Sequence, residues 1–187
     1  KPGRILDVAT GTGDLAIAMA RRIRDVQVLG VDLSEEMLAV ARRKVEQRGL
    51  DGRIVLDCGD AERLAAADGS VDVATVAFGV RNFGDLGAGL RELARTIKPG
   101  GKVVILEFSR PRNRVFRALY EFYSYKILPR IGGLVSRDKR AYEYLPASVG
   151  EFPAPEEFMA MMARAGFRNC RARSQSFGIA QIYIGER

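Results

Sequence analysis

Four aspartates stand where a carboxylate could hold a ligand that carries hydroxyl or positively charged groups. They are Asp7, Asp14, Asp32 and Asp60. The first of them opens the segment Asp7-Val8-Ala9-Thr10-Gly11-Thr12-Gly13, which joins an apolar run to an amphipathic one. Glycines in such a turn let the backbone approach a ligand closely at the start of a helix. Gly11 and Gly13 therefore predict a ligand-binding turn, and the aspartates indicate what the ligand carries.

The spacing of the acids favours an adenosine. Asp32 ends the next apolar run, 19 residues after Gly13, where a carboxylate can accept both hydroxyls of a ribose. Asp60 follows the third apolar run, in Cys58-Gly59-Asp60-Ala61, and could accept the amino group of an adenine. Together with the glycine turn, these two positions predict a cofactor that contains adenosine.

Two such cofactors compete for the site. The pattern Gly11-x-Gly13-x-x-Ala16 formally fits a dinucleotide such as NAD. However, Asp7 and Asp14 would lie where NAD places two phosphates, and like charges repel. S-adenosylmethionine carries an ammonium group instead, which Asp7 could bind directly or through water. The acidic surroundings therefore predict S-adenosylmethionine rather than NAD.

The elements that position these residues alternate between short apolar runs and amphipathic segments. We expect buried strands that do not alternate in polarity, which are typical of a parallel sheet covered on both faces. The prediction is a doubly wound, Rossmann-like α/β fold. Strands are expected at residues 4–9, 26–33, 53–58, 71–78 and 102–108, and helices at 13–24, 34–49 and 86–97.

The last third of the chain has a different pattern. A basic, aromatic helical stretch is expected at 110–128, a loop at 129–155 and a helix at 156–165. Two strands, 167–174 and 177–184, are expected to form an antiparallel hairpin across Gln175-Ser176. A parallel sheet that ends in an antiparallel strand is the architecture of class I methyltransferases. We therefore expect one methyltransferase domain over 1–187, with 110–155 as an insert-like segment.

Composition excludes several classes of site. The chain of 187 residues contains no histidine, which argues against zinc hydrolases and Ser-His-Asp enzymes. Its two cysteines, Cys58 and Cys170, have no paired spacing and are expected to be reduced thiols. No apolar run approaches the roughly 20 residues of a membrane-spanning helix, and there is no signal-peptide pattern. A cytoplasmic protein without a bound metal is expected.

Three stretches carry a more specific resemblance. They are Ala77-Phe78-Gly79-Val80-Arg81-Asn82, the run from Arg95-Thr96-Ile97-Lys98-Pro99-Gly100-Gly101 to Glu107-Phe108-Ser109, and Leu128-Pro129-Arg130-Ile131-Gly132. Taken in this order, the chain resembles the ubiquinone/menaquinone biosynthesis C-methyltransferases over essentially its whole length. The resemblance implies methylation of a ring carbon of a prenylated quinol, most closely demethylmenaquinol. It also implies an upstream helical segment that helps to close the active site, which this sequence does not contain.

The resemblance assigns site residues as well. It implies cofactor contacts at Thr12, Asp32, Asp60 and Ala61, and another at Ala77, where some members of the family carry a serine. Candidates for the chemistry are Arg81 and Asn82, which follow the fourth strand at the edge where ligands bind in such sheets. Tyr142 is a candidate for lining the quinol pocket. A structural ion pair for Arg81, a loop cap for Asn82 and simple packing for Tyr142 stay open.

Net charge is concentrated in one segment. Residues 110–140 contain nine basic and two acidic residues, so this segment alone matches the net charge of +7 of the chain. Five aromatic residues are interleaved there, a composition that favours an anionic membrane surface. We expect a cytoplasmic protein bound peripherally to the inner face of the membrane, with no nucleic acid partner. Nucleic acid would nevertheless be attracted by the same charge.

Two other functions stay open at this point. One is a methyltransferase that acts on RNA or on another small molecule, and the other is a non-catalytic module that binds S-adenosylmethionine. The identity of the base is also open, because a chain without histidine must use a carboxylate, a tyrosine or a held water. No oligomeric state follows from the sequence.

Overall fold

The computed structural model describes residues 2–109 and 149–187. The described part of the chain contains seven strands, with helices between most of them. The strands are β1 (Arg4–Val8), β2 (Gln27–Asp32), β3 (Ile54–Cys58), β4 (Val71–Ala77), β5 (Ile97–Phe108), β6 (Arg168–Gln175) and β7 (Ala180–Glu186). The helices are α1 (Asp14–Arg22), α2 (Glu35–Glu46), α3 (Leu86–Thr96) and α7 (Pro155–Arg164), with 3₁₀ turns η1 (Val80–Asn82) and η3 (Ser176–Gly178).

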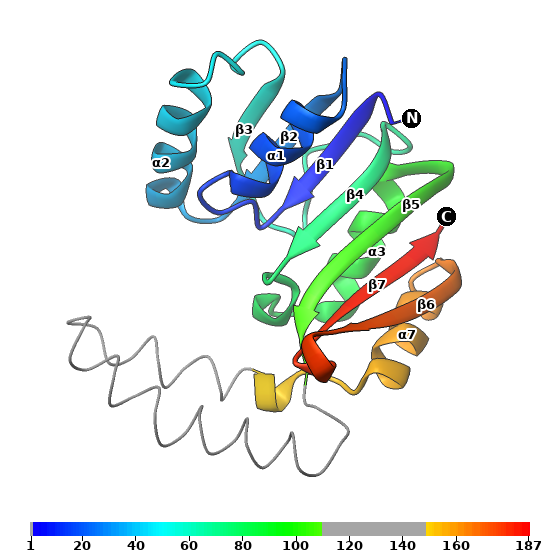
Figure 1. Cartoon of the computed structure of the whole chain (residues 1–187). Helices are drawn as coiled ribbons and strands as arrows, with labels where there is room; N and C mark the ends of the chain where they lie inside the picture. Colours follow the sequence, from blue (N-terminus) through cyan, green and yellow to red (C-terminus); the bar gives the residue numbers. More distant parts are fainter. Residues whose placement is uncertain (1, 110–148) are drawn as a thin grey trace, which may run out of the picture.

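The strands form a single sheet in the order β3-β2-β1-β4-β5-β7-β6 (Figure 1). Strands β1 to β5 pair in parallel, whereas β7 is antiparallel to both β5 and β6. This arrangement confirms the predicted Rossmann-like sheet with its antiparallel C-terminal strands. The carboxyl ends of β1, β2 and β4 meet at one edge, which is where ligands bind in open α/β sheets.

Helices cover both faces of the sheet, with α1 and α2 on one and α3 and α7 on the other (Figure 1). Each helix buries an apolar stripe of the kind that periodicity predicts, such as Leu38, Ala41 and Val45 on α2. Ser34 caps α2 as expected, since its side chain accepts the N–H of Met37 at 3.2 Å.

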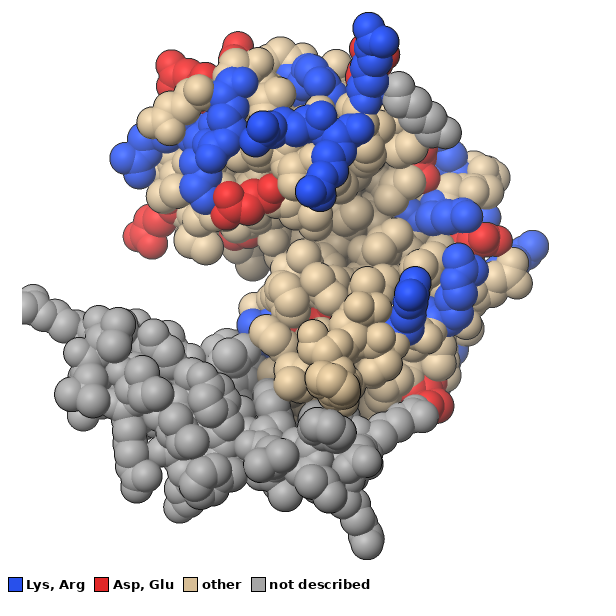
Figure 2. Space-filling view, in the orientation of Figure 1, with Lys and Arg blue, Asp and Glu red and all other residues tan. Residues whose placement is uncertain are grey.

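Basic side chains gather on the face that carries α1 and α2 (Figure 2). Arg21 and Arg22 end α1, and Arg43 and Lys44 lie in the last turn of α2. Cations are stabilised at the C-terminal ends of helices by the helix dipole, which accounts for their place in these last turns.

The start of β5 differs most from the prediction. β5 begins at Ile97 rather than at residue 102, because Ile97 pairs with Val71 of β4. Residues 98–101, which lie between the predicted helix and the predicted strand, belong to the sheet, and the N–H of Gly100 donates to the carbonyl of Arg187 at 2.8 Å. The register between β4 and β5 shifts there as a result.

The link between the last two strands is also longer than predicted. Ser176 and Phe177 have positive φ angles of 47° and 57°, so the backbone turns through η3 and β7 starts only at Ala180. Ser109 ties this turn to the end of β5, since its N–H donates to the carbonyl of Ile179 at 2.8 Å. The predicted helix at 110–128 and residues 129–148 of the predicted loop at 129–155 lie outside the described residues, whereas 149–151 of that loop are helical. Within residues 2–109 and 149–187, no helix has the length and apolar character that crossing a membrane requires.

Candidate functional site

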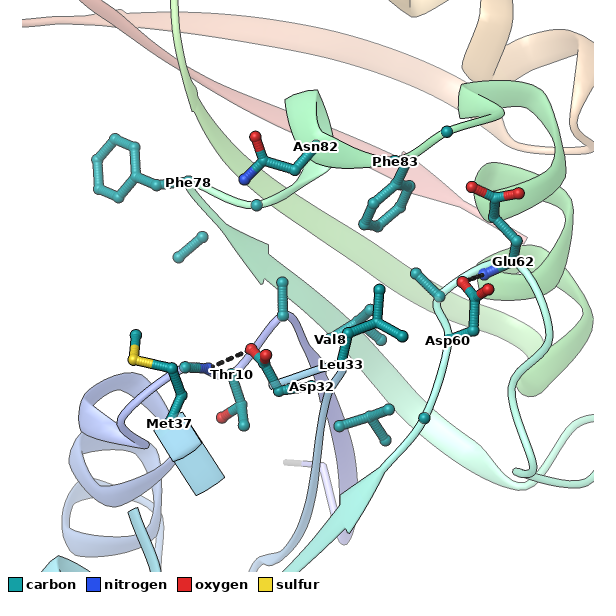
Figure 3. Close-up of a pocket in the computed structure, with 18 residues that line it drawn as sticks. Val8, Thr10, Asp32, Leu33, Met37, Asp60, Glu62, Phe78, Asn82 and Phe83 are labelled. Carbon is teal, nitrogen blue, oxygen red and sulfur yellow. Dashed lines mark hydrogen bonds between the residues drawn. The ribbon is translucent and has the colours of Figure 1, made fainter. Parts of the chain in front are cut away.

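A cavity of about 480 Å³ opens at the carboxyl edge of the sheet (Figure 3). Its walls come from the β1–α1 turn, the end of β2, residues 59–62 after β3, and residues 77–79 and 82–84 at and after the end of β4. Of the residues proposed to bind a cofactor, five line this cavity. They are Gly11, Asp32, Asp60, Ala61 and Ala77.

Asp32 holds the glycine turn in place. Its Oδ2 accepts the N–H of Gly11 at 2.7 Å (Figure 3), and its Oδ1 also accepts the N–H of Ser34 at 2.9 Å. Gly11 has a φ of 56°, a left-handed conformation that glycine adopts without strain. A carboxylate has about four acceptor sites, so two bonds to the backbone leave capacity for ligand hydroxyls.

A second carboxylate group lies across the cavity. Asp60 accepts the N–H of Glu62 on Oδ1 at 2.9 Å, and Glu62 in turn accepts the N–H of Asp85 at 2.9 Å. Glu62 lines the cavity as well, although sequence reasoning did not include it. The only feature of the sequence that could have indicated Glu62 is its position two residues after Asp60, and this position belongs to no binding motif.

Asp7 is not a lining residue. It is 1% exposed, and its two oxygens accept the hydroxyls of Thr10 at 2.7 Å and of Thr75 at 2.5 Å. Burial raises the pKa of this carboxyl from 3.8 to about 6. The structure therefore places Asp7 behind the wall of the cavity, and its predicted contact with an ammonium group, direct or through water, stays a prediction. Thr10, which does line the cavity, is the residue that connects Asp7 to it.

Three further residues of the first turn face away from the cavity. Thr12 donates its hydroxyl to Asp14 at 2.8 Å, and the Lys44 ammonium contacts both, at 2.8 Å and 2.9 Å. The bond from Lys44 lowers the pKa of Asp14. Asp14 is therefore paired with a cation, which the sequence could not show because Lys44 is 30 residues away. Gly13 packs instead against α2, where an added Cβ would lie 3.1 Å from the Cβ of Ala41.

The turn after β4 forms the opposite wall. Phe78 has a φ of 57° and lies 4.4 Å from the ring of Phe108, measured between ring centroids. At Gly79 an added Cβ would lie 2.3 Å from the Cβ of Ala9, so only glycine allows the two turns to touch. Asn82 points toward the cavity and lines it (Figure 3).

Arg81 lies just behind this wall. Its Nη1 donates to Oε1 of the fully buried Glu107 at 2.8 Å and also to the carbonyl of Phe78. The guanidinium carbon lies 5.5 Å from the centroid of the Phe108 ring. Arg81 is thus in the ion pair that the sequence left open, and it faces a second cavity of about 700 Å³ rather than the first. Tyr142 lies outside the described residues.

This geometry suits an adenosine-bearing cofactor. Two carboxylates stand at separate walls, a backbone turn that tolerates close approach lies between them, and Leu33, Met37 and Ala61 add apolar surface. Among the described residues, no group of three or more acidic or cysteine side chains is placed to hold a metal ion.

Comparison with known proteins gives a consistent result. The model of the ubiE/COQ5 methyltransferase family matches residues 1–187. The chain is 51% identical to the ubiquinone/menaquinone biosynthesis C-methyltransferase UbiE of Geobacter sulfurreducens, over 99% of this chain and 72% of that protein. It is 48% identical to the demethylmenaquinone methyltransferase of Thermus thermophilus, over 100% of this chain and 83% of that protein.

Solved structures of methyltransferases share the fold. A SAM-dependent methyltransferase from Aquifex aeolicus superposes with a TM-score of 0.71 at 19% identity, over 98% of this chain and 82% of that chain. Phosphoethanolamine N-methyltransferase 2 of Haemonchus contortus, in complex with S-adenosyl-L-methionine, gives 0.73 at 18% identity, over 98% and 48%. These likenesses confirm the class I methyltransferase fold.

Proposed function

The chain belongs to the ubiE/COQ5 methyltransferase family, and we propose that it transfers a methyl group from S-adenosylmethionine to a ring carbon of a prenylated quinol, most closely demethylmenaquinol. The observation that carries this proposal is the cavity in which Asp32 and Asp60 stand on separate walls. It occurs in a chain that matches the family from its first residue to its last. The UbiE and demethylmenaquinone methyltransferase names of similar proteins support the choice of substrate.

Asp32 and Asp60 would hold the two ends of the adenosine. Asp32 would accept the ribose hydroxyls while it continues to fix Gly11, and Asp60 would accept the adenine amino group. Bonds to ionised acceptors are stronger than neutral ones, which suits them to this task. When bound, the cofactor supplies an electrophilic sulfonium methyl group.

The chain's own contribution to the reaction is to orient the quinol and to manage one proton. A ring carbon becomes nucleophilic when its neighbouring hydroxyl loses or shares its proton. Asn82, at the cavity wall, can hydrogen-bond that hydroxyl. A guanidinium has no acceptor and cannot be the base, but Arg81, behind the same wall, would stabilise a developing phenolate. Glu107 keeps the guanidinium in that place.

A second cavity offers room for the apolar part of the substrate. It adjoins the first at Phe83 and Gly84, and its walls include Leu86, Phe152 and Met161. A prenyl chain would bury apolar surface there at about 25 cal/mol per Å². The proposed pathway for the substrate therefore leads past Arg81, between the two cavities.

We also propose that the enzyme works at the inner face of the membrane from the cytoplasm, because a prenylated quinol resides in the bilayer. The support is the charge of residues 110–140, which lie outside the described part of the chain. Each basic residue near an anionic surface contributes about 1 kcal/mol.

Methyl transfer tests the proposal directly. The chain would be incubated with S-adenosylmethionine labelled on its methyl group and with a short-chain demethylmenaquinol kept reduced. Label in the extracted menaquinol is the expected result. Label in added RNA but not in the quinol would contradict the proposal. Calorimetry with S-adenosylhomocysteine and NAD tests the cofactor separately, since tighter binding of NAD would reject S-adenosylmethionine.

A further inference from the structure

The wall that carries Asp60 is an irregular segment. Residues 59–70 connect β3 to β4, and no helix or strand forms between these two strands. Parallel strands are usually joined through a crossover helix, whose backbone groups satisfy one another. An irregular connection must find partners for its N–H and carbonyl groups elsewhere. What fixes this connection therefore also fixes one wall of the cofactor cavity.

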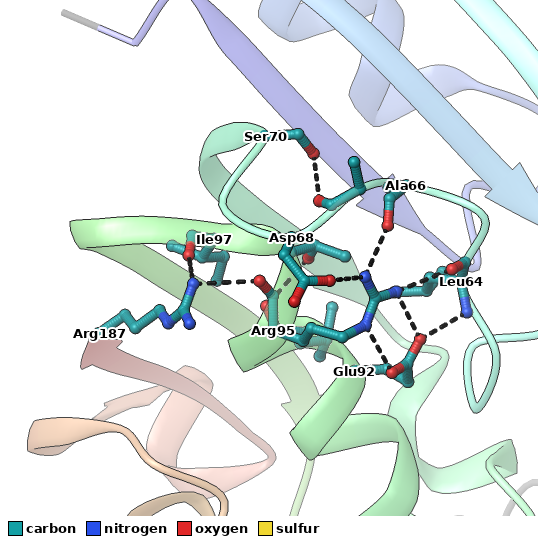
Figure 4. Close-up of polar contacts among 11 residues, drawn as sticks. Leu64, Ala66, Asp68, Ser70, Glu92, Arg95, Ile97 and Arg187 are labelled. Atoms are coloured by element: carbon teal, nitrogen blue, oxygen red, sulfur yellow. Dashed lines mark hydrogen bonds and ion pairs between the residues drawn. The ribbon is translucent and has the colours of Figure 1, made fainter.

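Arg95 of α3 holds the connection through its side chain (Figure 4). Nη2 donates to the carbonyl of Leu64 at 2.8 Å, and Nη1 donates to the carbonyl of Ala66 at 2.9 Å and to Asp68 at 2.5 Å. Nε and Nη2 also donate to the two oxygens of Glu92, both at 2.8 Å. A guanidinium has five N–H donors, and these five acceptors match them.

The same helix binds the connection at further points. Glu92 accepts the N–H of Leu64 at 2.8 Å, so Leu64 is held at both its N–H and its carbonyl. The backbone carbonyl of Arg95 accepts the N–H of Gly69 at 2.9 Å. The stretch 64–69 is therefore fastened to α3 by its backbone, and the Leu64 side chain is buried in the core.

Only three residues separate this fastening from Asp60. Within them, the N–H of Arg63 donates to the Asp60 carbonyl at 3.1 Å, and the N–H of Glu62 donates to the Asp60 carboxylate at 2.9 Å. A tight turn of this kind transmits a displacement of Leu64 to Asp60. Arg95 itself lines neither the cofactor cavity nor the cavity beside it.

We propose that Arg95 is a positioning residue for adenine recognition, which acts by fixing Leu64 and Ala66 and thereby the place of the Asp60 carboxylate. The inference rests on the proposed function, in which Asp60 accepts the adenine amino group. Selection between an amino and an oxo group requires an acceptor held in one place, because a mobile wall can withdraw from the wrong base. The wall would thus supply specificity only while Arg95 holds it.

Replacement of Arg95 by lysine removes the fastening and keeps the positive charge. Lysine is a single-point cation and cannot reach four groups in a plane as a guanidinium does. The measurement is the ratio of dissociation constants for S-adenosylhomocysteine and S-inosylhomocysteine, by calorimetry on the full chain. The inosine compound carries an oxo group where adenine has its amino group. We expect the wild type to prefer adenine by about tenfold or more, the scale of one bond to a charged acceptor.

In Arg95→Lys this preference should fall to about threefold or less. The matched control is Arg91→Lys, one turn earlier on α3, where the arginine is 63% exposed and lies 3.9 Å from Asp85. The control should keep the wild-type ratio. If Arg95→Lys weakens both ligands by the same factor and leaves the ratio unchanged, Arg95 only stabilises the fold and the proposal is overturned.

Glu92→Gln provides the second variant if Arg95→Lys does not fold. It keeps the shape of the side chain but weakens the bonds to Arg95 and Leu64, so the ratio should fall part of the way. An unchanged ratio in a folded Glu92→Gln protein would overturn the proposal as well. Failure of the proposed function looks different, because the wild type itself would then bind the two ligands equally or not at all.

Discussion

Replacement of Asp7 by asparagine should stabilise the fold at neutral pH, and the gain should fade in acid. The Asp7 carboxyl is 1% exposed, and burial raises its pKa from 3.8 to about 6 despite the hydroxyls of Thr10 and Thr75. A raised pKa means that the unfolded chain releases this proton at a lower pH than the folded chain does. The free energy of unfolding therefore decreases as the pH rises from about 4 to about 6, and the loss is complete above that range.

The size of the effect follows from the shift. About two pKa units at 1.36 kcal/mol each correspond to about 3 kcal/mol of stability lost above pH 6. Asparagine carries no charge to bury, and its amide can bond both threonines because a hydroxyl both donates and accepts. At pH 7.5 Asp7→Asn should therefore be more stable than the wild type by up to about 3 kcal/mol. At pH 4 most of this difference should be absent.

Urea unfolding at pH 4 and at pH 7.5 measures the prediction. Subtraction of the wild-type values at each pH removes the contributions of the other titrating groups, which both proteins share. Asp51→Asn is the control, because this aspartate is exposed in a turn. A stability difference between Asp7→Asn and wild type that is equal at the two pH values would refute the reasoning.

The remaining predictions concern binding and turnover. Asp32→Ala should weaken binding of S-adenosylhomocysteine more than tenfold by calorimetry, since it loses the ribose contacts and frees the N–H of Gly11. A smaller loss would mean that the ribose lies elsewhere. Arg81→Ala should lower turnover about tenfold or more with cofactor affinity unchanged, and an equal fall in both would show a structural role. The full chain should sediment with anionic vesicles in preference to neutral vesicles and RNA, and should be released as salt rises. Charge reversal at Arg112, Arg114 and Arg117 should abolish this preference for anionic vesicles. Tighter binding to RNA than to anionic vesicles would contradict the prediction.

Residues at the ends of strands could be predicted from the sequence. Asp32 and Asp60 each follow an apolar run, and the carboxyl ends of parallel strands must meet at one edge of the sheet. Gly11 could be predicted for a similar reason, because the turn between a strand and its helix begins at that edge. These positions depend only on the order of elements along the chain, and the structure places all three at the cavity.

The orientation of side chains within strands could not be predicted in the same way. Both faces of a parallel sheet are covered, so its strands show no alternation that separates a buried residue from a lining one. Asp7 belongs to such a strand, and its side chain reaches Thr75 of the neighbouring strand instead of the cavity. The hydrogen bond between Asp7 and Thr75 exists because β1 pairs with β4 in the sheet. The two residues are 68 positions apart in the chain, so local sequence does not relate them.

The partners of Arg95 and Arg81 could not be predicted for a related reason. Arg95 and Leu64 are 31 residues apart, and Arg81 and Glu107 are 26 apart. Nothing in local sequence relates the members of such pairs, whereas a glycine turn or a helix cap is complete within a few residues. The sequence could therefore indicate which residues form the walls of the cavity, but not which distant side chains fix those walls in place.

The three turns that form the walls of the cofactor cavity are fixed in the same physical way. Three charged side chains fix the three turns around the cavity by bonds to backbone groups: Asp32 to Gly11, Glu107 to Arg81, and Arg95 to Leu64. Each bond joins an ion to a peptide group, a kind that is stronger than a bond between two neutral groups. The sheet beneath the cavity rests on apolar burial instead. Neutral replacements at the three positions should therefore loosen the cavity before they unfold the sheet, so that cofactor binding is lost at temperatures where the strands remain intact.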